Sequence, residues 1–158
     1  MVHTVRSAVF RKWPTGLVAK GNTWCYILRM SRVFINRSVA KWMRRSRFSE
    51  RQLCDAVAEM QRGLIDADLG GGIVKKRVAI KDRGKSAGAR TLIATNRSDR
   101  WLFLYAFEKA ERANITPKEL NALQQVAQLF LDLRSEDLNQ YAMHWALQEI
   151  CHEQKIVH

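Results

Sequence analysis

The chain has 158 residues and a formal net charge of +12, from 27 Lys and Arg against 15 Asp and Glu. This length suits one domain with a hydrophobic core, and the charge favours polyanions as partners, nucleic acid before acidic proteins or anionic membranes. No stretch approaches the roughly 18 apolar residues of a membrane span. Three widely spaced cysteines match neither a disulfide framework nor a zinc motif, so we expect a reducing cytoplasm and Cys54 as a buried thiol.

The positive charge is concentrated in the first two thirds of the chain. Residues 1–49 hold 11 Lys and Arg and no acid, whereas residues 116–158 hold 3 Lys and Arg against 6 acids. Residues 1–29 show no sustained hydrophobic period. We predict that they form a disordered leader, or upstream sequence translated by mis-assignment with Met30 as the functional start. Mass spectrometry of the N-terminus of the native product tests this prediction.

Two helices are predicted after a short strand at residues 32–35. Asn36 can cap a helix over about 37–45, and Ser49 with Gln52 forms the capping box of a second. In the second helix apolar side chains repeat at helical spacing at Leu53, Val57 and Met60. We expect the two helices to form an α-hairpin that covers one side of a sheet.

A basic strand–loop–strand stretch follows the glycine run 70–72, which we interpret as a flexible link rather than a phosphate-binding loop. Strands are predicted at 73–80 and 90–95, with residues 81–89 as the loop between them. A period of two puts Lys75 and Arg77 on one strand face and Lys76 on the other. Because cations are almost never buried without a partner, the first face must meet water, an acid or a phosphate.

The last predicted strand, 100–107, is apolar on both faces and is therefore expected inside the sheet. Simple alternation puts Trp101, Phe103, Tyr105 and Phe107 on one face. A helix is then predicted from the Thr116–Glu119 capping box, and a final helix from about Ser135 with Trp145 on its apolar side.

The central residues resemble a subgroup of the RelE/ParE superfamily of toxins from bacterial toxin–antitoxin systems. The similarity lies in GLIDADLGGGIVKKRVA (63–79), GKS (84–86), RTL (90–92), FLYAFEK (103–109) and ERANI (111–115). It implies an α+β, RelE-like fold: two N-terminal helices packed on a small, mostly antiparallel sheet, followed by C-terminal helices. The domain spans residues 30–133, and residues 134–158 form a C-terminal helical extension.

The resemblance also implies a function. RelE-type members cut mRNA, often in the ribosomal A site, whereas ParE-type members inhibit DNA gyrase; both are neutralised by a cognate antitoxin, in this subgroup typically a helix-turn-helix protein. Arg90 matches the arginine that holds the scissile phosphate, and Lys75 and Arg77 lie on the strand with the basic catalytic groups. Lys109 and Arg112 match basic residues at the end of the last strand.

Three positions depart from the subgroup pattern. Ala89 and Thr95 stand where an aromatic residue is usual, and Glu108 replaces a small residue. A missing aromatic is expected to weaken base stacking by roughly 1–3 kcal/mol where such stacking occurs.

A cluster of cationic side chains can catalyse the cleavage of RNA, because the substrate carries its own nucleophile, the 2′-OH. The enzyme must align the attack, move two protons and neutralise the phosphorane, and the planar fork of Arg holds two phosphate oxygens. Lys can act as base or acid when neighbouring cations lower its pKa. Tyr105 can stack on a base or shuttle a proton, or it is a core aromatic.

These residues make up the predicted site of a cytoplasmic mRNA endoribonuclease with no cofactor and no metal, since no His, Cys or Asp cluster has ligand spacing. The predicted catalytic residues are Lys75, Arg77, Arg90 and Tyr105, and the predicted RNA-binding residues are Lys76, Lys81, Arg83, Lys85, Lys109 and Arg112. The alternatives are a ParE-like gyrase inhibitor and a catalytically inactive nucleic-acid-binding relic.

Overall fold

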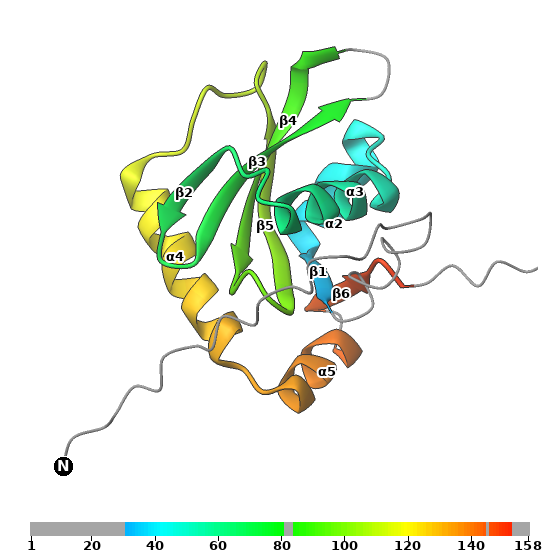
Figure 1. Ribbon diagram of the computed structural model, residues 1–158, viewed down its shortest axis with the longest axis vertical. Coiled ribbons are helices and arrows are strands. Elements are labelled where there is room, and N and C mark those ends of the chain that lie inside the picture. The colour runs from blue at the N-terminus through cyan, green and yellow to red at the C-terminus, as the bar shows by residue number, and fades with distance from the viewer. Residues whose placement is uncertain (1–30, 81–83, 145, 153–158) are drawn as a thin grey trace, which may run out of the picture.

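The computed structural model describes residues 31–80, 84–144 and 146–152. Within these residues the chain folds into a six-stranded mixed sheet with four helices, an α+β architecture (Figure 1). The leader predicted over residues 1–29 lies outside the described residues. The elements in chain order are β1 (Arg32–Asn36), α2 (Arg37–Ser46), α3 (Glu50–Gln61), β2 (Ala67–Gly70), β3 (Ile73–Ile80), β4 (Gly84–Thr95), β5 (Arg100–Glu108), α4 (Pro117–Asp132), α5 (Ser135–Met143) and β6 (Leu147–Ile150).

The strands lie in the order β2-β3-β4-β5-β1-β6. β1 is parallel to β5, and the other neighbouring pairs are antiparallel. Parallel neighbours need a long crossover connection, and here α2, α3 and the strands β2 to β4 lie between β1 and β5 in the chain. β5 pairs on both sides, which confirms the prediction of an inner strand at residues 100–107.

Helices α2 and α3 begin where their capping residues predict. The Asn36 side chain accepts a hydrogen bond from the Val39 N–H at 2.9 Å, and Ser49 forms a reciprocal capping box with Gln52. Their apolar faces pack with one side of the sheet into a buried cluster. The cluster includes Val39, Trp42, Met43, Leu53, Val57 and Met60 from the helices and Val33, Ile35, Val74, Ile93, Trp101 and Phe103 from the strands.

Helices α4 and α5 pack on the other side of the sheet (Figure 1). The predicted Thr116–Glu119 capping box begins α4, and Phe130 meets Phe34 edge to face with ring centroids 5.8 Å apart. Arg100 donates hydrogen bonds to the carbonyls of Phe130, Leu131 and Leu133 at the end of α4. A cation there complements the helix dipole and adds hydrogen bonds to carbonyls at the helix end, where the Phe130 carbonyl also accepts a bond from the Leu133 N–H.

The glycine run forms a tight turn held against α4. Gly70, Gly71 and Gly72 have φ values of 76°, 61° and 79°, and they link β2, which was not predicted, to β3. The side chain of Gln124 donates to the Leu69 carbonyl at 3.0 Å, and that of Gln128 to the Gly71 carbonyl at 3.1 Å. Left-handed backbone in consecutive residues explains the need for glycine.

Replacing Gly71 with Ala is expected to destabilise the protein more than replacing Gly63. Both glycines have positive φ, which costs about 1–2 kcal/mol for an alanine. A Cβ at Gly71 would lie 2.7 Å from Cγ of Gln124, whereas one at Gly63 meets nothing within 4 Å. Displacing Gln124 should cost about 1 kcal/mol more through its lost hydrogen bond. Urea unfolding of both variants checks this, and equal losses would contradict it.

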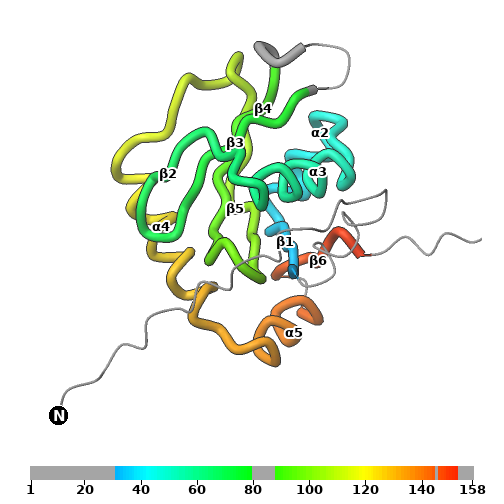
Figure 2. Tube along the Cα trace, viewed as in Figure 1, coloured from blue at the N-terminus to red at the C-terminus, as the bar shows by residue number. Residues whose placement is uncertain are grey.

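Two further stretches differ from the sequence prediction. Residues 84–89, predicted as loop, belong to β4, whose pairing with β3 extends to Ile80 and Gly84. The final helix ends at Met143, and residues 147–150 form β6, which pairs antiparallel with β1 (Figure 2). Residues 84–89 extend the hairpin of β4 with its neighbour in the chain, β3, whereas β6 pairs with β1, a strand distant in sequence. The pattern of apolar residues along the sequence reveals neither pairing.

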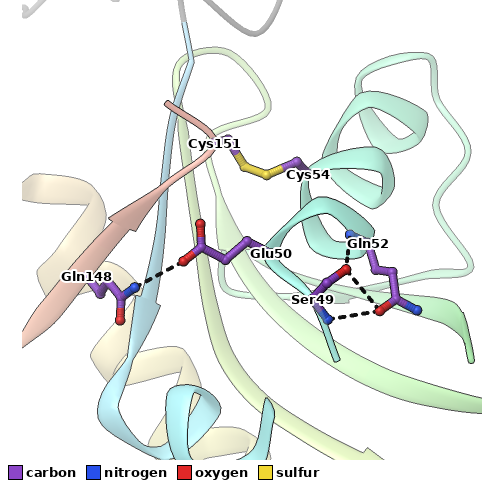
Figure 3. The surroundings of a disulfide bond; sticks show 6 residues. All are labelled: Ser49, Glu50, Gln52, Cys54, Gln148 and Cys151. Carbon is purple, nitrogen blue, oxygen red and sulfur yellow. Dashed lines mark hydrogen bonds between the residues drawn. A yellow bond between two sulfur atoms is a disulfide. The ribbon is translucent and has the colours of Figure 1, made fainter. Parts of the chain in front are cut away.

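The expectation of Cys54 as a buried thiol is wrong, because Cys54 and Cys151 form a disulfide (Figure 3). The bridge joins α3 to the residue after β6 across a sequence separation of 97 residues. A hydrogen bond of 3.2 Å from the Gln148 side chain to Glu50 lies beside it. The pairing of β6 with β1 brings Cys151 to α3, which cysteine spacing in the sequence cannot show. Cys25 lies outside the described residues.

Candidate functional site

The sheet face that α4 covers remains open toward one end, and this end carries cations. In the row nearest the helix, Ile73, Ala94 and Leu102 pair across β3, β4 and β5 and are buried with residues of α4. Two further rows lie beyond it: Lys75–Leu92–Tyr105 and Arg77–Arg90–Phe107. We call Lys75, Arg77, Arg90 and Tyr105, all partly or fully exposed, the open face.

A β-bulge in β5 places Tyr105 on the open face. Leu92 pairs with Tyr105 and the next residue, Ile93, pairs with Phe103, so Leu104 has no partner in β4. An extra residue shifts the following side chains to the opposite face. The predicted grouping of Tyr105 and Phe107 with Trp101 and Phe103 is therefore wrong: Trp101 and Phe103 pack with α2 and α3, whereas Tyr105 packs on the α4 side.

Positive charge on the open face is only partly compensated. Arg77 and Arg90 are directly opposite each other on adjacent strands, an arrangement of like charges that destabilises a sheet. Asp66 accepts a hydrogen bond from the Arg77 backbone at 2.6 Å and lies 3.4 Å from its guanidinium. No carboxylate of the described residues pairs with Arg90 or Lys75. A phosphate between these cations would supply the missing negative charge.

Arg112 forms a hydrogen-bonded group at the edge of the open face. Its guanidinium binds both carboxylate oxygens of Glu119, at 2.9 and 2.8 Å, and donates to the Tyr105 hydroxyl at 3.3 Å. It also lies over the Phe107 ring, 5.9 Å from the centroid, and Phe107 lies 5.7 Å from Tyr105. Hydrogen bonds from Arg112 and then from the Thr116 backbone lower the pKa of Glu119 to about 2, and hydrogen bonds to Glu119 and Tyr105 raise the pKa of Arg112.

The lowered pKa of Glu119 predicts a pH-dependent contribution to stability. The pKa falls from an ordinary value of 4.5 to about 2 in the folded state, so the contribution is present above pH 4.5 and is lost as the pH falls through about 2. Glu119→Gln keeps a capping side chain and removes the charge. We expect a lower Tm than wild type at pH 7 and a difference that shrinks toward pH 2. A difference independent of pH would contradict this assignment.

The predicted RNA-binding residues do not all join the open face. Lys76 is buried on the opposite side of the sheet, where its Nζ lies 2.6 Å from a Glu59 carboxylate oxygen and donates to the Leu64 carbonyl at 2.8 Å. Lys109 is exposed just beyond the end of β5. Lys81 and Arg83 lie outside the described residues, as does the side chain of Lys85 within β4.

The structure shows where the three residues that depart from the family pattern lie: Ala89, Thr95 and Glu108. Ala89 is fully buried in the cluster with α2 and α3, so its side chain lies on the opposite side of the sheet from Arg90. Thr95 is buried, and its hydroxyl accepts a hydrogen bond from the Arg97 N–H at 2.8 Å. Glu108, partly exposed, pairs with Ala89 across the strands. The expected loss of base stacking therefore does not follow from Ala89.

Sequence reasoning missed three residues of this region: Asp66, Phe107 and Glu119. Glu119 was assigned only to the capping box of α4, although the same carboxylate also binds Arg112. Arg112 and Glu119 are seven residues apart with Pro117 between them, which is not the spacing of three or four residues that indicates an ion pair within a helix. Simple alternation rightly groups Phe107 with Tyr105 but wrongly adds Trp101 and Phe103, because the bulge is not visible in the sequence.

The described residues thus form a small α+β domain whose open face carries partly compensated positive charge beside an aromatic side chain. No helix among the described residues is long and apolar enough to cross a membrane. A family model described as the RelE toxin of the RelE / RelB toxin-antitoxin system matches residues 31–150, and the chain therefore belongs to the RelE toxin family. This family implies an antitoxin partner. Comparison with curated proteins gives no match.

Proposed function

We propose that this toxin is an mRNA endoribonuclease that inhibits translation and acts without a metal ion. The observation that carries the proposal is the juxtaposition of Arg90 with Arg77, with Lys75 and Tyr105 in the adjacent row of the same open face. Two arginines directly opposite each other weaken the sheet unless an anion lies between them. A phosphodiester matches both the charge and the geometry of their guanidinium groups.

The proposed reaction is an internal attack by the 2′-OH on the adjacent phosphate. A bond forms between O2′ and phosphorus, and the bond from phosphorus to O5′ breaks. The 2′-hydroxyl proton leaves to a base, for which Lys75 is our candidate, and O5′ receives a proton. The products are a 2′,3′-cyclic phosphate and a 5′-OH. Arg90, with Arg77 beside it, neutralises the extra charge of the phosphorane, a task that fixed cations perform well.

The proposed physiological setting is the cytoplasm, with mRNA as substrate, free or on the ribosome. This proposal rests on the substrate and no longer on the cysteines, since Cys54 and Cys151 form a disulfide. The proposed antitoxin is a helix-turn-helix protein that lays an acidic segment over the open face. Such a segment should protect Lys75 from acetylation by a small reagent in the toxin–antitoxin complex. If Lys75 were modified equally in the free toxin and in the complex, neutralisation would have to use another surface.

An RNA cleavage assay tests the proposed function. End-labelled mRNA is incubated with the toxin in EDTA, with and without translating ribosomes, and the new ends are analysed. Cuts that leave a cyclic phosphate would support the proposal, and the lane that contains them would show whether ribosomes are needed. No cutting, together with inhibition of supercoiling by DNA gyrase, would favour the ParE-like alternative. Binding of RNA without either activity would indicate an inactive relic.

A further inference from the structure

We propose that Arg112 and Glu119 are positioning residues that aim the Tyr105 hydroxyl proton at the open face, so that Tyr105 is the acid that protonates the leaving O5′. This inference rests on the proposed ribonuclease function and assigns roles within the same site. It also replaces the predicted role of Arg112 as a direct RNA contact.

The hydrogen bonds of Arg112 leave it poorly able to hold a phosphate. A guanidinium has five N–H donors. The Nε donor binds the Asn114 carbonyl at 2.9 Å, and the two terminal nitrogens bind Glu119 and Tyr105. The paired donors that would form a two-pronged contact with phosphate are already occupied by the Glu119 carboxylate. Arg112 is thus committed to neighbours within the protein.

The bond between Arg112 and Tyr105 fixes the direction of the tyrosine proton. Arginine has only donors, so at 3.3 Å the Tyr105 oxygen must be the acceptor. The hydroxyl proton is therefore not used in this contact, and it finds no acceptor among the described residues. Tyr105 is diagonal to Arg90 across adjacent strands, a Cα separation of about 7–8 Å for such pairs. A phosphate held by Arg90 would lie within reach of the hydroxyl.

The tyrosine ring and the guanidinium are both anchored. Tyr105 packs against the cluster under α4 and lies 5.7 Å from the Phe107 ring, over which Arg112 also sits. Glu119 is in the first turn of α4, where its Oε2 accepts a bond from the Thr116 N–H at 2.7 Å. A continuous path of contacts from the beginning of α4 through Glu119 and Arg112 therefore determines where the Tyr105 oxygen lies.

The proton balance of the step is complete. As the bond from phosphorus to O5′ breaks, Tyr105 gives its proton to O5′, and the resulting phenolate lies beside the permanent charge of Arg112. Water restores the proton after the products leave. A positioned general acid typically contributes about 10²–10⁴-fold to a rate. Displacing it by about 1 Å through a lost support can cost about 10²-fold.

A double-mutant cycle with a modified substrate tests the inference. Tyr105→Phe, Glu119→Gln, Arg112→Gln and the two double variants with Tyr105→Phe are compared by kcat and KM on an RNA with one cleavable linkage. We expect Tyr105→Phe to lower kcat by at least about 10²-fold. Glu119→Gln and Arg112→Gln should lower kcat by about 10- to 100-fold with KM unchanged, and should add nothing in the Tyr105→Phe background.

The second substrate carries sulfur in place of the bridging O5′, a leaving group that needs no proton. All these variants should cleave it at close to the wild-type rate. Asp137→Asn is the matched control, because it breaks the exposed pair of Arg134 and Asp137 at the start of α5, and its kcat should equal that of wild type. Thermal melting of each variant shows that it is folded.

Additive losses in the cycle, or a sulfur substrate that does not restore cleavage, would overturn the inference while leaving the ribonuclease assignment intact. Those outcomes would mean that Glu119 and Arg112 only support the fold. If wild type cleaves neither substrate, the proposed function fails and the inference fails with it.

Discussion

Replacing Arg90 with Ala is expected to lower the rate of RNA cleavage by about 10²–10³-fold, the typical effect of removing one preorganised group from the charge that develops in a transition state. Arg90 lies in the middle of the open face, opposite Arg77 on β3 and paired with Phe107 on β5. Because no carboxylate of the described part of the chain occupies its guanidinium, the group is available to a phosphate. Arg90→Lys keeps the charge but loses the planar fork, so we expect an intermediate rate.

The same substitution should not destabilise the protein. It removes a like-charge pair with Arg77, which lies directly opposite. Urea unfolding should therefore give an unfolding free energy at least equal to that of wild type, while cleavage and growth arrest are lost. Arg97→Ala is the matched control, because Arg97 is paired with Asp68 away from the open face. Equal losses of cleavage in the two variants would show that total charge, rather than Arg90, is what matters.

Removing the disulfide is expected to lower the stability of the protein by several kcal/mol and to leave its activity unchanged. A bridge between residues 97 apart restricts the unfolded chain, and a loop of about 100 residues corresponds to about 4.7 kcal/mol in the chain-entropy description. Cys54→Ser and Cys151→Ser should each lose a free energy of this order in oxidising buffer. The bridge also ties β6 to α3, so unfolding should expose β6 early in these variants.

The control for this prediction uses reductant and the third cysteine. Wild type in a thiol reductant should unfold like Cys54→Ser, whereas reductant should not change the Cys54→Ser variant. Cys25→Ser leaves both bridging residues in place and should match wild type in oxidising and reducing buffer. If reductant left the urea midpoint of wild type unchanged, the bridge would not be present in solution.

Local features of this fold could be predicted because their causes are local. The helix starts at Asn36, Ser49 and Thr116 follow from side chains that accept hydrogen bonds from backbone N–H groups three residues away. The inner position of β5 follows from its apolar side chains on both faces. The alternation of side chains along a strand was also sufficient to predict that Lys75 and Arg77 share one face of β3 and that Lys76 lies on the other, since β3 has no bulge between them.

The α+β class, the helix starts and the concentration of cations on one strand could therefore be predicted from the amino-acid sequence. That Tyr105 shares a face with Arg90 could not be predicted, because one residue without a partner in β4, Leu104, reverses the alternation of side chains along β5. Likewise, Glu119 meets Arg112 and Cys54 meets Cys151 only once α4 and β6 have packed on the sheet. Such contacts depend on how the strands align and on how the helices pack on them. The packing of the whole domain sets both, and no repeating pattern of residues in the sequence indicates them.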